Sequence, residues 1–160
     1  MNNGIFLLLG TNLGDRMVNL SVARGHIEQK VGMIDNASPI YKTAPWGNTD
    51  QPEFYNQALS LGTGFSPHEL LENVLEIETM MGRQRREKWG ARIIDIDILF
   101  YGEMVVTTPQ LIIPHPGILH RRFVLQPMAE IAGEFIHPEL RKTISTLLNE
   151  CEDHSAIDIV

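Results

Sequence analysis

Cysteine is almost absent from the sequence, and the single residue, Cys151, has no partner for a disulfide within the chain, which fits a reducing compartment. Basic residues are also scarce, with 13 lysines and arginines against 20 aspartates and glutamates and a formal net charge of −7. This balance argues against a broad nucleic-acid-binding surface. The apolar run at residues 5–9 is too short for a membrane span or a signal-peptide core. We therefore expect a cytoplasmic protein without nucleic-acid or membrane partners.

The sequence also lacks both glycine motifs that commonly hold nucleotide phosphates. The segment LLLGTNLGD, residues 7–15, follows a predicted strand but fits neither GxxxxGK[ST] nor GxGxxG. We interpret it as a tight turn from a strand into a helix. No repeat, low-complexity tract or linker is visible. Because the chain has 160 residues, of which 43% are hydrophobic, we expect one domain over residues 1–160 with its own core.

Hydrophobic periodicity predicts the element order β-α-β-β-α-β. In the clearest helix, Ser66 is the N-cap, Pro67 the first helical residue and Glu69 the partner in a capping box. The order is that of an α+β, ferredoxin-like βαββαβ fold, an antiparallel sheet with helices packed on it, followed here by an extra hairpin and helices. The tail after residue 150 gives no signal. Strands are expected at residues 4–14, 32–47, 54–64 and around 95–97, a hairpin at 103–114, and helices after Asp15 and at 66–82, 119–133 and 137–150.

Two aspartates interrupt the otherwise apolar segment at residues 90–102. Asp95 and Asp97 are two apart, so a strand places both on one face, with α-carbons about 6.5 Å apart. Two carboxylates this close raise each other's pKa unless a cation neutralises them, and Mg²⁺ favours such oxygen ligands. A solvent-exposed sheet face would explain the pair equally well. The expected strand puts the remaining apolar residues on two sides: Ile94, Ile96, Ile98 and Phe100 toward the core, and Ile93 and Leu99 with the aspartates.

A cluster of basic residues precedes this strand. Guanidinium groups bind phosphate oxygens through paired hydrogen bonds, and carboxylates beside arginines are the combination that nucleotide chemistry requires. The alternative is a solvated charge run on a surface turn, which Trp89, embedded in the run, disfavours. The cluster and strand together indicate a polyphosphate site. Its basic members are Arg83, Arg85, Arg86, Lys88 and Arg92.

Several segments resemble one enzyme family, 6-hydroxymethyl-7,8-dihydropterin pyrophosphokinase, in its order and spacing. The signature KWGARIIDIDIL, residues 88–99, fits at every position, and the likeness covers about residues 4–133. The resemblance implies transfer of diphosphate from ATP to the hydroxymethyl group of 6-hydroxymethyl-7,8-dihydropterin in folate biosynthesis, with AMP as the other product and two Mg²⁺ ions. The other matching segments are LLLGTNLGDR, SPIYKTAPWG, DQPEFYNQAL, IETMMGRQRR and LIIPHPGILHRRFVLQPMAEIAG.

The resemblance also implies roles for individual residues. Asp95 and Asp97 would hold the two ions, and Arg83 and Arg92 would act with them as catalytic residues. The implied pterin-binding set is Thr43, Pro45, Trp46, Phe54, Asn56, Trp89 and Phe123. The implied nucleotide-binding set is Glu78, Arg85, Trp89, Ile98, His115 and Arg121. The chain departs from the family pattern at Phe54, Gln110, Ile112 and Pro116, of which the last three bear on the grip on ATP.

Two other functions remain open on the residues alone. A two-metal nucleotidyltransferase or cyclase on the same fold would use Asp95 and Asp97 in a similar way. A ferredoxin-like RNA-binding module would need aromatic residues on the sheet face and a broad basic surface, which the net charge disfavours. We expect a monomer, and no feature of the sequence determines the oligomeric state.

Overall fold

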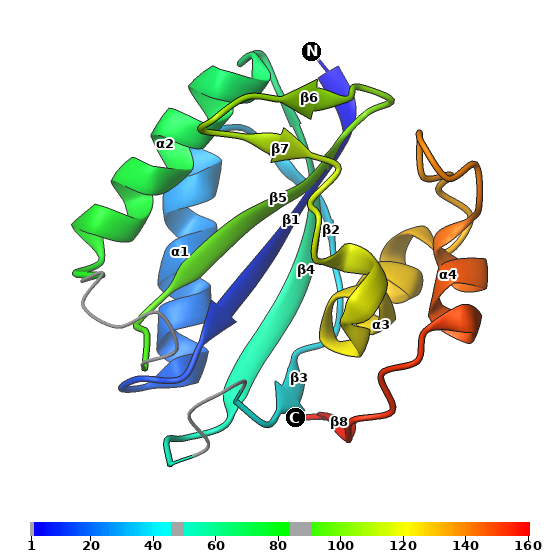
Figure 1. Cartoon of the computed structure of the whole chain (residues 1–160). Coiled ribbons are helices and arrows are strands. Elements are labelled where there is room, and N and C mark those ends of the chain that lie inside the picture. The colour runs from blue at the N-terminus through cyan, green and yellow to red at the C-terminus, as the bar shows by residue number, and fades with distance from the viewer. Residues whose placement is uncertain (1, 46–49, 84–90) are drawn as a thin grey trace.

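The computed structural model describes residues 2–45, 50–83 and 91–160, and its central feature is an antiparallel sheet (Figure 1). The strands lie in the order β5-β1-β4-β3-β8, and β2 also pairs with β4. This is the expected ferredoxin-like arrangement, extended by β8. The strands are β1 (Asn2–Thr11), β2 (Ile34–Ala37), β3 (Tyr41–Thr43), β4 (Phe54–Thr63), β5 (Asp95–Tyr101) and β8 (Ile157–Ile159), with a separate hairpin of β6 (Val106–Thr107) and β7 (Ile112–Ile113). The helices are α1 (Arg16–Lys30), α2 (Pro67–Met80), the 3₁₀ turn η1 (Ile118–His120), α3 (Arg122–Ala132) and α4 (Ile144–Glu150).

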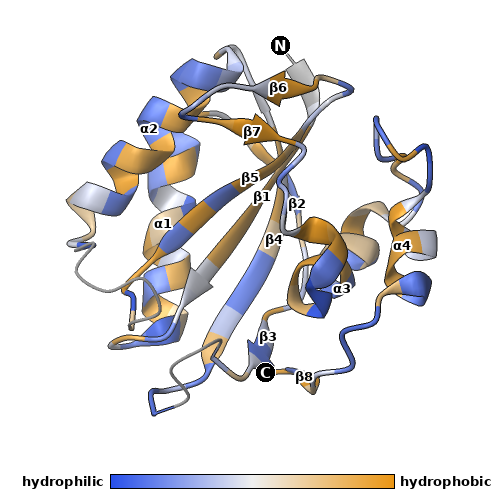
Figure 2. Ribbon diagram, in the orientation of Figure 1, coloured by the Kyte–Doolittle hydropathy of each residue, from blue (hydrophilic) through white to orange (hydrophobic). Residues whose placement is uncertain are grey.

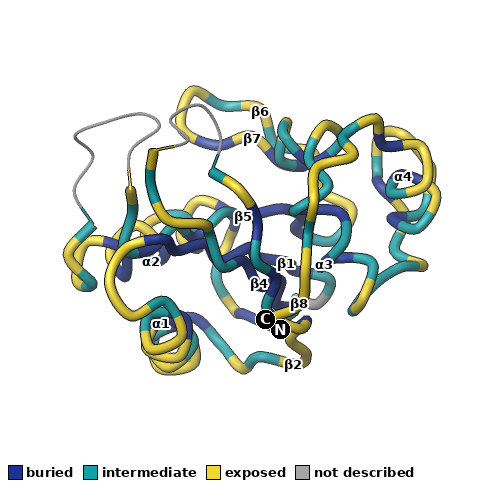
Figure 3. Tube along the Cα trace, turned by 90° about the horizontal axis from the view of Figure 1, so that it is seen from below, coloured by how far each residue is buried: buried dark blue, intermediate teal, exposed yellow. Residues whose placement is uncertain are grey.

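The helices cover the sheet from both sides (Figures 1 and 3). On one face, α1 and α2 pack over a core that includes Leu7, Leu61 and Ile77, each with no exposed surface. On the other face, η1, α3 and α4 pack over a second core that includes Phe100 and Leu125. The elements η1, α3 and α4 cover only part of this second face (Figure 1). The rest of the face is left open for a functional site.

The predicted caps of the first two helices are confirmed. The Asp15 carboxylate accepts a hydrogen bond from the Val18 amide at 3.1 Å and starts α1. At α2, the Ser66 hydroxyl accepts from the Glu69 amide at 3.3 Å, and the Glu69 carboxylate accepts from the Ser66 amide at 2.9 Å. This capping box fixes the start of the helix whose far end leads to Arg83. Among the described residues, no helix is long and apolar enough to cross a bilayer.

The expected second strand, residues 32–47, is divided in the structure into β2 and β3. The break lies at Ser38 and Pro39, between the two strands. The Ser38 hydroxyl accepts the hydrogen bond of the Ala58 amide at 3.0 Å, and Pro39 has no amide hydrogen to donate. The ladder to β4 is therefore interrupted and resumes at Tyr41.

Two expectations about the segment around β5 are wrong. Ile93, just before the strand, packs against the core under α1 and α2 and does not lie with the aspartates. Ile94, Ile96 and Ile98 face the α1/α2 core as predicted, but Phe100 faces the other core together with Leu99. The cause is a bulge, because β1 pairs Leu7 with Ile98 but Phe6 with Phe100, and this leaves Leu99 as an extra residue on β5. The strict alternation of sides therefore ends after residue 98. Figure 2 shows that the central strands are largely apolar and that their hydrophilic stretches lie toward one end of the sheet.

The C-terminal region also departs from the sequence prediction. The helix expected at 137–150 begins only at Ile144, because Thr143 is its N-cap and accepts from the Thr146 amide at 3.1 Å. Upstream, the His137 Nδ1 accepts from the amides of Glu139 and Leu140, both at 3.2 Å, which closes a turn in place of a helix. The tail without a sequence signal forms β8 on β3. The predicted hairpin and the helix containing Pro127 are confirmed as β6-β7 and α3.

Two glycines of the α1 region provide a test of this packing. A Cβ on Gly32 would lie 1.9 Å from the Gly62 carbonyl oxygen of β4, whereas a Cβ on Gly25, inside α1, would meet nothing within 4 Å. We expect Gly32→Ala to lower the free energy of unfolding by about 1–3 kcal/mol through overpacking. The matched Gly25→Ala should raise it by roughly 0.5–1 kcal/mol through helix propensity. Urea titration followed by circular dichroism measures both, and equal effects would contradict the close approach of the α1–β2 turn to β4.

Candidate active site

The two aspartates lie on the partly uncovered face of the sheet. In the register with β1, Asp95 stands opposite Gly10 and Asp97 opposite Leu8, so both side chains leave the sheet on the same side. Both line a cavity of about 840 Å³ between β5, one side of α2 from His68 to Thr79, and the segment 109–116. The two carboxylates therefore lie on one face of the sheet, as their spacing in the strand predicts.

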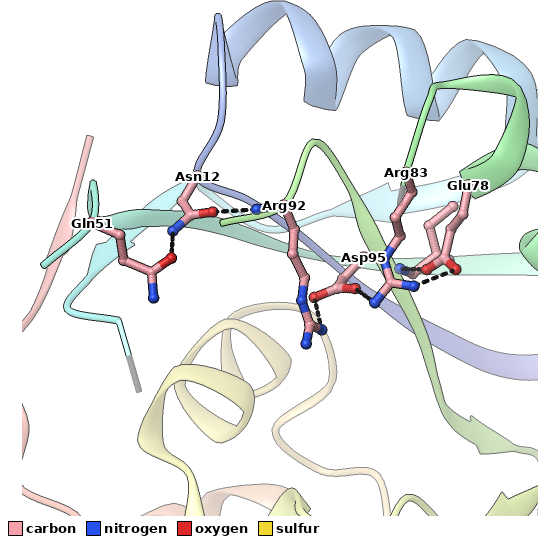
Figure 4. Close-up of polar contacts among 7 residues, drawn as sticks. Asn12, Gln51, Glu78, Arg83, Arg92 and Asp95 are labelled. Carbon is pink, nitrogen blue, oxygen red and sulfur yellow. Dashed lines mark hydrogen bonds and ion pairs between the residues drawn. The ribbon is translucent and has the colours of Figure 1, made fainter. Parts of the chain in front are cut away.

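Asp95 is bound by two arginines from different parts of the chain (Figure 4). Its Oδ1 lies 2.8 Å from Nη2 of Arg83, which follows α2, and its Oδ2 lies 2.9 Å from Nη1 of Arg92, which precedes β5. The Arg83 side chain is only 8% exposed, and its Nη1 is 3.8 Å from Oε1 of Glu78. Within the described residues, the buried Nε and Nη1 of Arg83 have no hydrogen-bond acceptor. Each oxygen of Asp95 thus has its own guanidinium, and two nitrogens of Arg83 stay buried beside the ion pair without an acceptor among the described residues.

Glu78 joins α2 to the edge of β5. Its side chain is buried, and its Oε2 accepts a hydrogen bond from the Ile96 amide at 2.7 Å. The family resemblance assigns it to the nucleotide, and it does line the cavity. Its contact with Ile96 also holds the β5 backbone between the two aspartates.

Asn12 positions Arg92, a role that was not predicted from the sequence. The backbone amide of Arg92 donates to Asn12 Oδ1 at 2.7 Å, and the backbone amide of Asn12 donates to the Arg92 carbonyl at 3.0 Å. Asn12 Nδ2 in turn donates to Gln51 Oε1 at 2.9 Å and to the Pro52 carbonyl at 3.0 Å (Figure 4). The turn GTNLG therefore ties the start of β5 to the segment before β4. The available signal was an asparagine in a turn that directly follows a strand.

Asp97 and His115 both line the cavity, and the charge of each shifts the pKa of the other. Burial raises the pKa of Asp97, the neighbouring Asp95 adds to this, and His115, Arg121 and Arg92 oppose it. Burial lowers the pKa of His115, with Asp97 acting in the opposite direction. His115 Nδ1 accepts from the Gly117 amide at 3.0 Å, so the neutral ring carries its proton on Nε2. The ring can therefore donate one hydrogen bond from Nε2.

Three of the predicted pterin-binding residues, Thr43, Phe54 and Asn56, lie on β3 and β4, across β1 from the aspartates. Thr43 and Asn56 are buried, and Asn56 Nδ2 donates to Thr43 Oγ1 at 2.9 Å. Phe54 is partly buried and pairs with Thr43. Gly10 pairs with Asn56 on one side and with Asp95 on the other, so these two side chains share one sheet face across about 10 Å. A Cβ on Gly10 would come within 3.1 Å of Asn56 Oδ1, so the missing side chain leaves the floor between them clear.

The remaining predicted residues divide into three groups. Phe123 is partly buried in the first turn of α3, and the guanidinium carbon of Arg121, the N-cap, lies 5.9 Å from its ring centroid. Pro45 is partly buried just after β3, and Ile98 belongs to the core while lining the cavity. Trp46, Arg85 and Trp89 lie outside the described residues, as do Arg86 and Lys88. The departures Gln110, Ile112 and Pro116 all line the cavity.

A cation at this site has two carboxylates available. In the part of the chain that the structure describes, no group of three or more histidines, cysteines or acidic residues comes together as a metal cluster. Two neighbouring carboxylates with open space beside them suit an ion that keeps water or substrate oxygens in its shell, which is how Mg²⁺ binds. The donor set therefore fits Mg²⁺ and does not fit a closed structural zinc site.

The raised pKa of Asp97 makes the site costly for folding. Because the folded state favours the protonated carboxyl, the stability contributed by this group is complete below its ordinary pKa of 3.8 and is lost as pH rises through the folded-state pKa. An asparagine amide in its place cannot ionise. Without divalent cations, we expect Asp97→Asn to unfold at a higher urea concentration than wild type at pH 7, with the difference shrinking toward pH 3.8. The exposed Asp35 of β2 provides the control Asp35→Asn. A difference that grows on acidification would contradict a raised pKa at Asp97.

Comparisons with known proteins identify the family. The model of the family described as 7,8-dihydro-6-hydroxymethylpterin-pyrophosphokinase (HPPK) matches residues 6–133. A 2-amino-4-hydroxy-6-hydroxymethyldihydropteridine pyrophosphokinase of Methylorubrum extorquens is 42% identical over 132 residues, 82% of this chain and 84% of that protein. The Bacillus subtilis protein of the same name is 42% identical over 135 residues, 84% of this chain and 81% of that protein.

Longer proteins also contain the fold. A folic acid synthesis protein of Dictyostelium discoideum is 38% identical over 91% of this chain, which spans 22% of that protein. A crystal structure of Plasmodium falciparum HPPK-DHPS superimposes with a TM-score of 0.76 at 21% identity, over 94% of this chain and 43% of that one. That likeness concerns the fold, whereas the family match rests on sequence over most of the chain. The chain belongs to the 7,8-dihydro-6-hydroxymethylpterin-pyrophosphokinase family.

Proposed function

We propose that the face of the sheet between Asn56 and Asp97 is where this chain carries out the reaction of its family. That reaction transfers diphosphate from ATP to the hydroxymethyl group of 6-hydroxymethyl-7,8-dihydropterin and releases AMP, as a step of folate synthesis. The observation that carries the proposal is the register at Gly10, which pairs with Asn56 and with Asp95. A group that can read a pterin edge and a carboxylate that can hold a cation therefore flank one open floor.

The cavity beside β5 is proposed to take ATP. Its volume of about 840 Å³ falls within the range of ligand pockets, and Arg83, Arg92 and His115 offer donors along its wall. In this proposal the nucleotide contacts Glu78 and Ile98 in the cavity wall, and its phosphates lie at the two arginines. Arg121, which opposes the raised pKa of Asp97, adds positive charge from the α3 side. Arg85 and Trp89 are proposed to complete this group.

Asp95 and Asp97 are proposed to hold Mg²⁺, as two ions. When bound there, such ions would neutralise the phosphates and would lower the pKa of the attacking hydroxyl. The carboxylate pair supplies the negative charge for them, and the mutual repulsion that helps raise the pKa of Asp97 is the electrostatic cost of that preorganisation.

Arg83 and Arg92 are proposed to alternate between Asp95 and phosphate. Both oxygens of Asp95 are paired with guanidinium groups, and a cation bound to the same carboxylate would compete with them for its negative charge. A guanidinium released in this way would still lie in the wall of the same cavity, where the phosphate oxygens of a bound nucleotide would accept its hydrogen bonds. Charge on the transferring diphosphate would then be met by groups already in position.

The pterin is proposed to lie over Gly10. Asn56 would hydrogen-bond the amide edge of the ring, with Thr43 holding the Asn56 amide in place at 2.9 Å. Phe123 would stack on the ring from α3, and Pro45, Trp46, Phe54 and Trp89 would enclose it. The span of about 10 Å between Asn56 and Asp95 leaves the hydroxymethyl group directed at the aspartates. Positioning of the two substrates then supplies much of the rate enhancement.

Product analysis tests the proposed function. The wild-type chain is incubated with ATP, Mg²⁺ and reduced 6-hydroxymethylpterin, and the products are identified by mass. AMP together with a diphosphorylated pterin is the expected result. Release of pyrophosphate with a nucleotidylated acceptor would replace the proposal with a nucleotidyltransferase. No consumption of ATP by folded protein would contradict both.

We expect Asp95→Asn and Asp97→Asn each to reduce Mg²⁺-dependent turnover by at least ~100-fold, because each removes a carboxylate from the metal position. Both variants should stay folded by circular dichroism. Direct titration with Mn²⁺ plus a non-hydrolysable ATP analogue should show weakened cation binding. Asp35→Asn is the matched control, exposed and on β2. Near-normal turnover in either site variant would refute the metal assignment.

Arg92→Ala separates a transition-state role from a ground-state role. If Arg92 moves from Asp95 to phosphate during the reaction, kcat should fall by roughly 10²-fold or more while the Kd for the ATP analogue changes only a few-fold. Single-turnover kinetics and equilibrium titration provide the two values. Equal losses in both would instead assign Arg92 to ground-state nucleotide binding.

A further inference from the structure

We infer that Asp153 is a positioning residue for pterin binding, acting through the C-terminal strap, residues 151–160. The strap links the first turn of α3, which carries Phe123, to β3, which carries Thr43. These are two walls of the proposed pterin pocket, and the strap contacts both without belonging to either. The inference rests on the proposed function, since it concerns the pocket assigned there.

Asp153 supplies the cap that α3 lacks locally. The N-cap residue of α3, Arg121, makes no side-chain capping hydrogen bond. Instead, the amide of Arg122, the first helical residue, donates to Asp153 Oδ2 at 3.0 Å, from 31 residues away in sequence. A carboxylate at this position satisfies a free amide and also interacts favourably with the helix dipole. Phe123 is the next residue, so the cap acts directly on the turn that holds its ring.

The Asp153 carboxylate is itself fixed. Its Oδ1 accepts from the Ser155 amide at 3.0 Å and from the Ser155 hydroxyl at 2.5 Å. Arg122 returns the contact, donating from Nη1 to the Ser155 carbonyl at 3.3 Å. Burial alone would raise the pKa of Asp153, but the hydrogen bonds from Ser155 and Arg122 outweigh it and hold that pKa below its usual range. The cap is therefore ionised at neutral pH.

The other end of the strap completes β3. Ile157 pairs with Thr43 and Ile159 with Tyr41, and the Val160 amide donates to the Ile40 carbonyl at 2.9 Å. Figure 1 shows the strap, in red, running from α4 to β3. Because β3 has three residues, it would otherwise be a short edge strand with one ladder only.

A third contact joins α3 directly to β3. The Tyr41 hydroxyl of β3 donates to Glu130 Oε1 of α3 at 2.7 Å. Glu130 lies near the end of α3, whereas Asp153 acts at its start, so the helix is tied to β3 at both ends, once directly and once through the strap. The strap therefore sets the distance between Phe123 and Thr43. A displacement of about 1 Å at such a wall is enough to impair substrate positioning.

The test compares binding of two ligands by folded variants. Reduced 6-hydroxymethylpterin is titrated in the presence of Mg²⁺ and a non-hydrolysable ATP analogue, and the analogue with Mg²⁺ is titrated alone. We expect Asp153→Ala to raise the pterin Kd by about fivefold or more, because the amide at the start of α3 loses its carboxylate acceptor and the turn that carries Phe123 is no longer held in place. The Kd of the analogue should stay within about twofold. Asp153→Asn, which keeps an acceptor oxygen for the Arg122 amide, should recover part of the pterin affinity.

Two controls make the outcome decisive. Asp158→Ala removes an exposed carboxylate on β8 and should leave both Kd values unchanged. If Asp153→Ala does not fold, Ser155→Ala, which removes one bond to the carboxylate, should shift the pterin Kd in the same direction. Unchanged pterin affinity in folded Asp153 or Ser155 variants, or an equal loss for both ligands, would overturn the inference. Failure of the wild-type chain to bind the pterin would instead overturn the proposed function.

Discussion

The ion pairs between Asp95 and the two arginines are the contacts on which the arrangement of the site depends. Arg83 arrives from the end of α2 and Arg92 from the start of β5, and they meet at opposite oxygens of one carboxylate. The acidic chain thus gathers positive charge where it places two aspartates together. A pair of carboxylates on a half-buried sheet face would otherwise be strongly unfavourable, because the two negative charges repel each other and lose contact with water. The same two guanidinium groups are also suited to binding phosphate oxygens.

The backbone beneath the site is fixed from several directions. Glu78 binds the Ile96 amide between the aspartates, and Asn12 binds both the amide and the carbonyl of Arg92. Each contact satisfies a backbone group at the edge of the sheet while holding a functional residue beside it. The bulge at Leu99 belongs to the same design, because it turns Leu99 and Phe100 together into the second core and leaves the aspartate end of β5 outside it. Rigid support of this kind keeps charged groups in place before substrates arrive.

The two faces of the sheet have different tasks. The face under α1 and α2 is closed by a continuous apolar core, and it provides the stability. The opposite face is divided between the core under α3 and α4 and the open floor around Gly10. The proposed site therefore lies where this packing ends, and the C-terminal strap borders it by joining α3 to β3. Three of the four departures from the family pattern, Gln110, Ile112 and Pro116, lie in the cavity wall and not among the ion pairs, so they leave the charged centre unchanged.

Local patterns in the sequence determined the helix caps at Asp15 and Ser66, the element order and the shared face of Asp95 and Asp97, because each depends on residues at most a few positions apart. The resemblance of KWGARIIDIDIL to a known signature determined the family. Only the tertiary structure decided the pairs that join distant segments: Asn12 with Arg92, Glu78 with Ile96 and Asp153 with Arg122. It also decided the turn of Phe100 to the second core, since a bulge depends on the register with the neighbouring strand. Hydrogen bonds across tens of residues leave no periodic trace in a sequence, which is why the tail gave no signal before its partners were known.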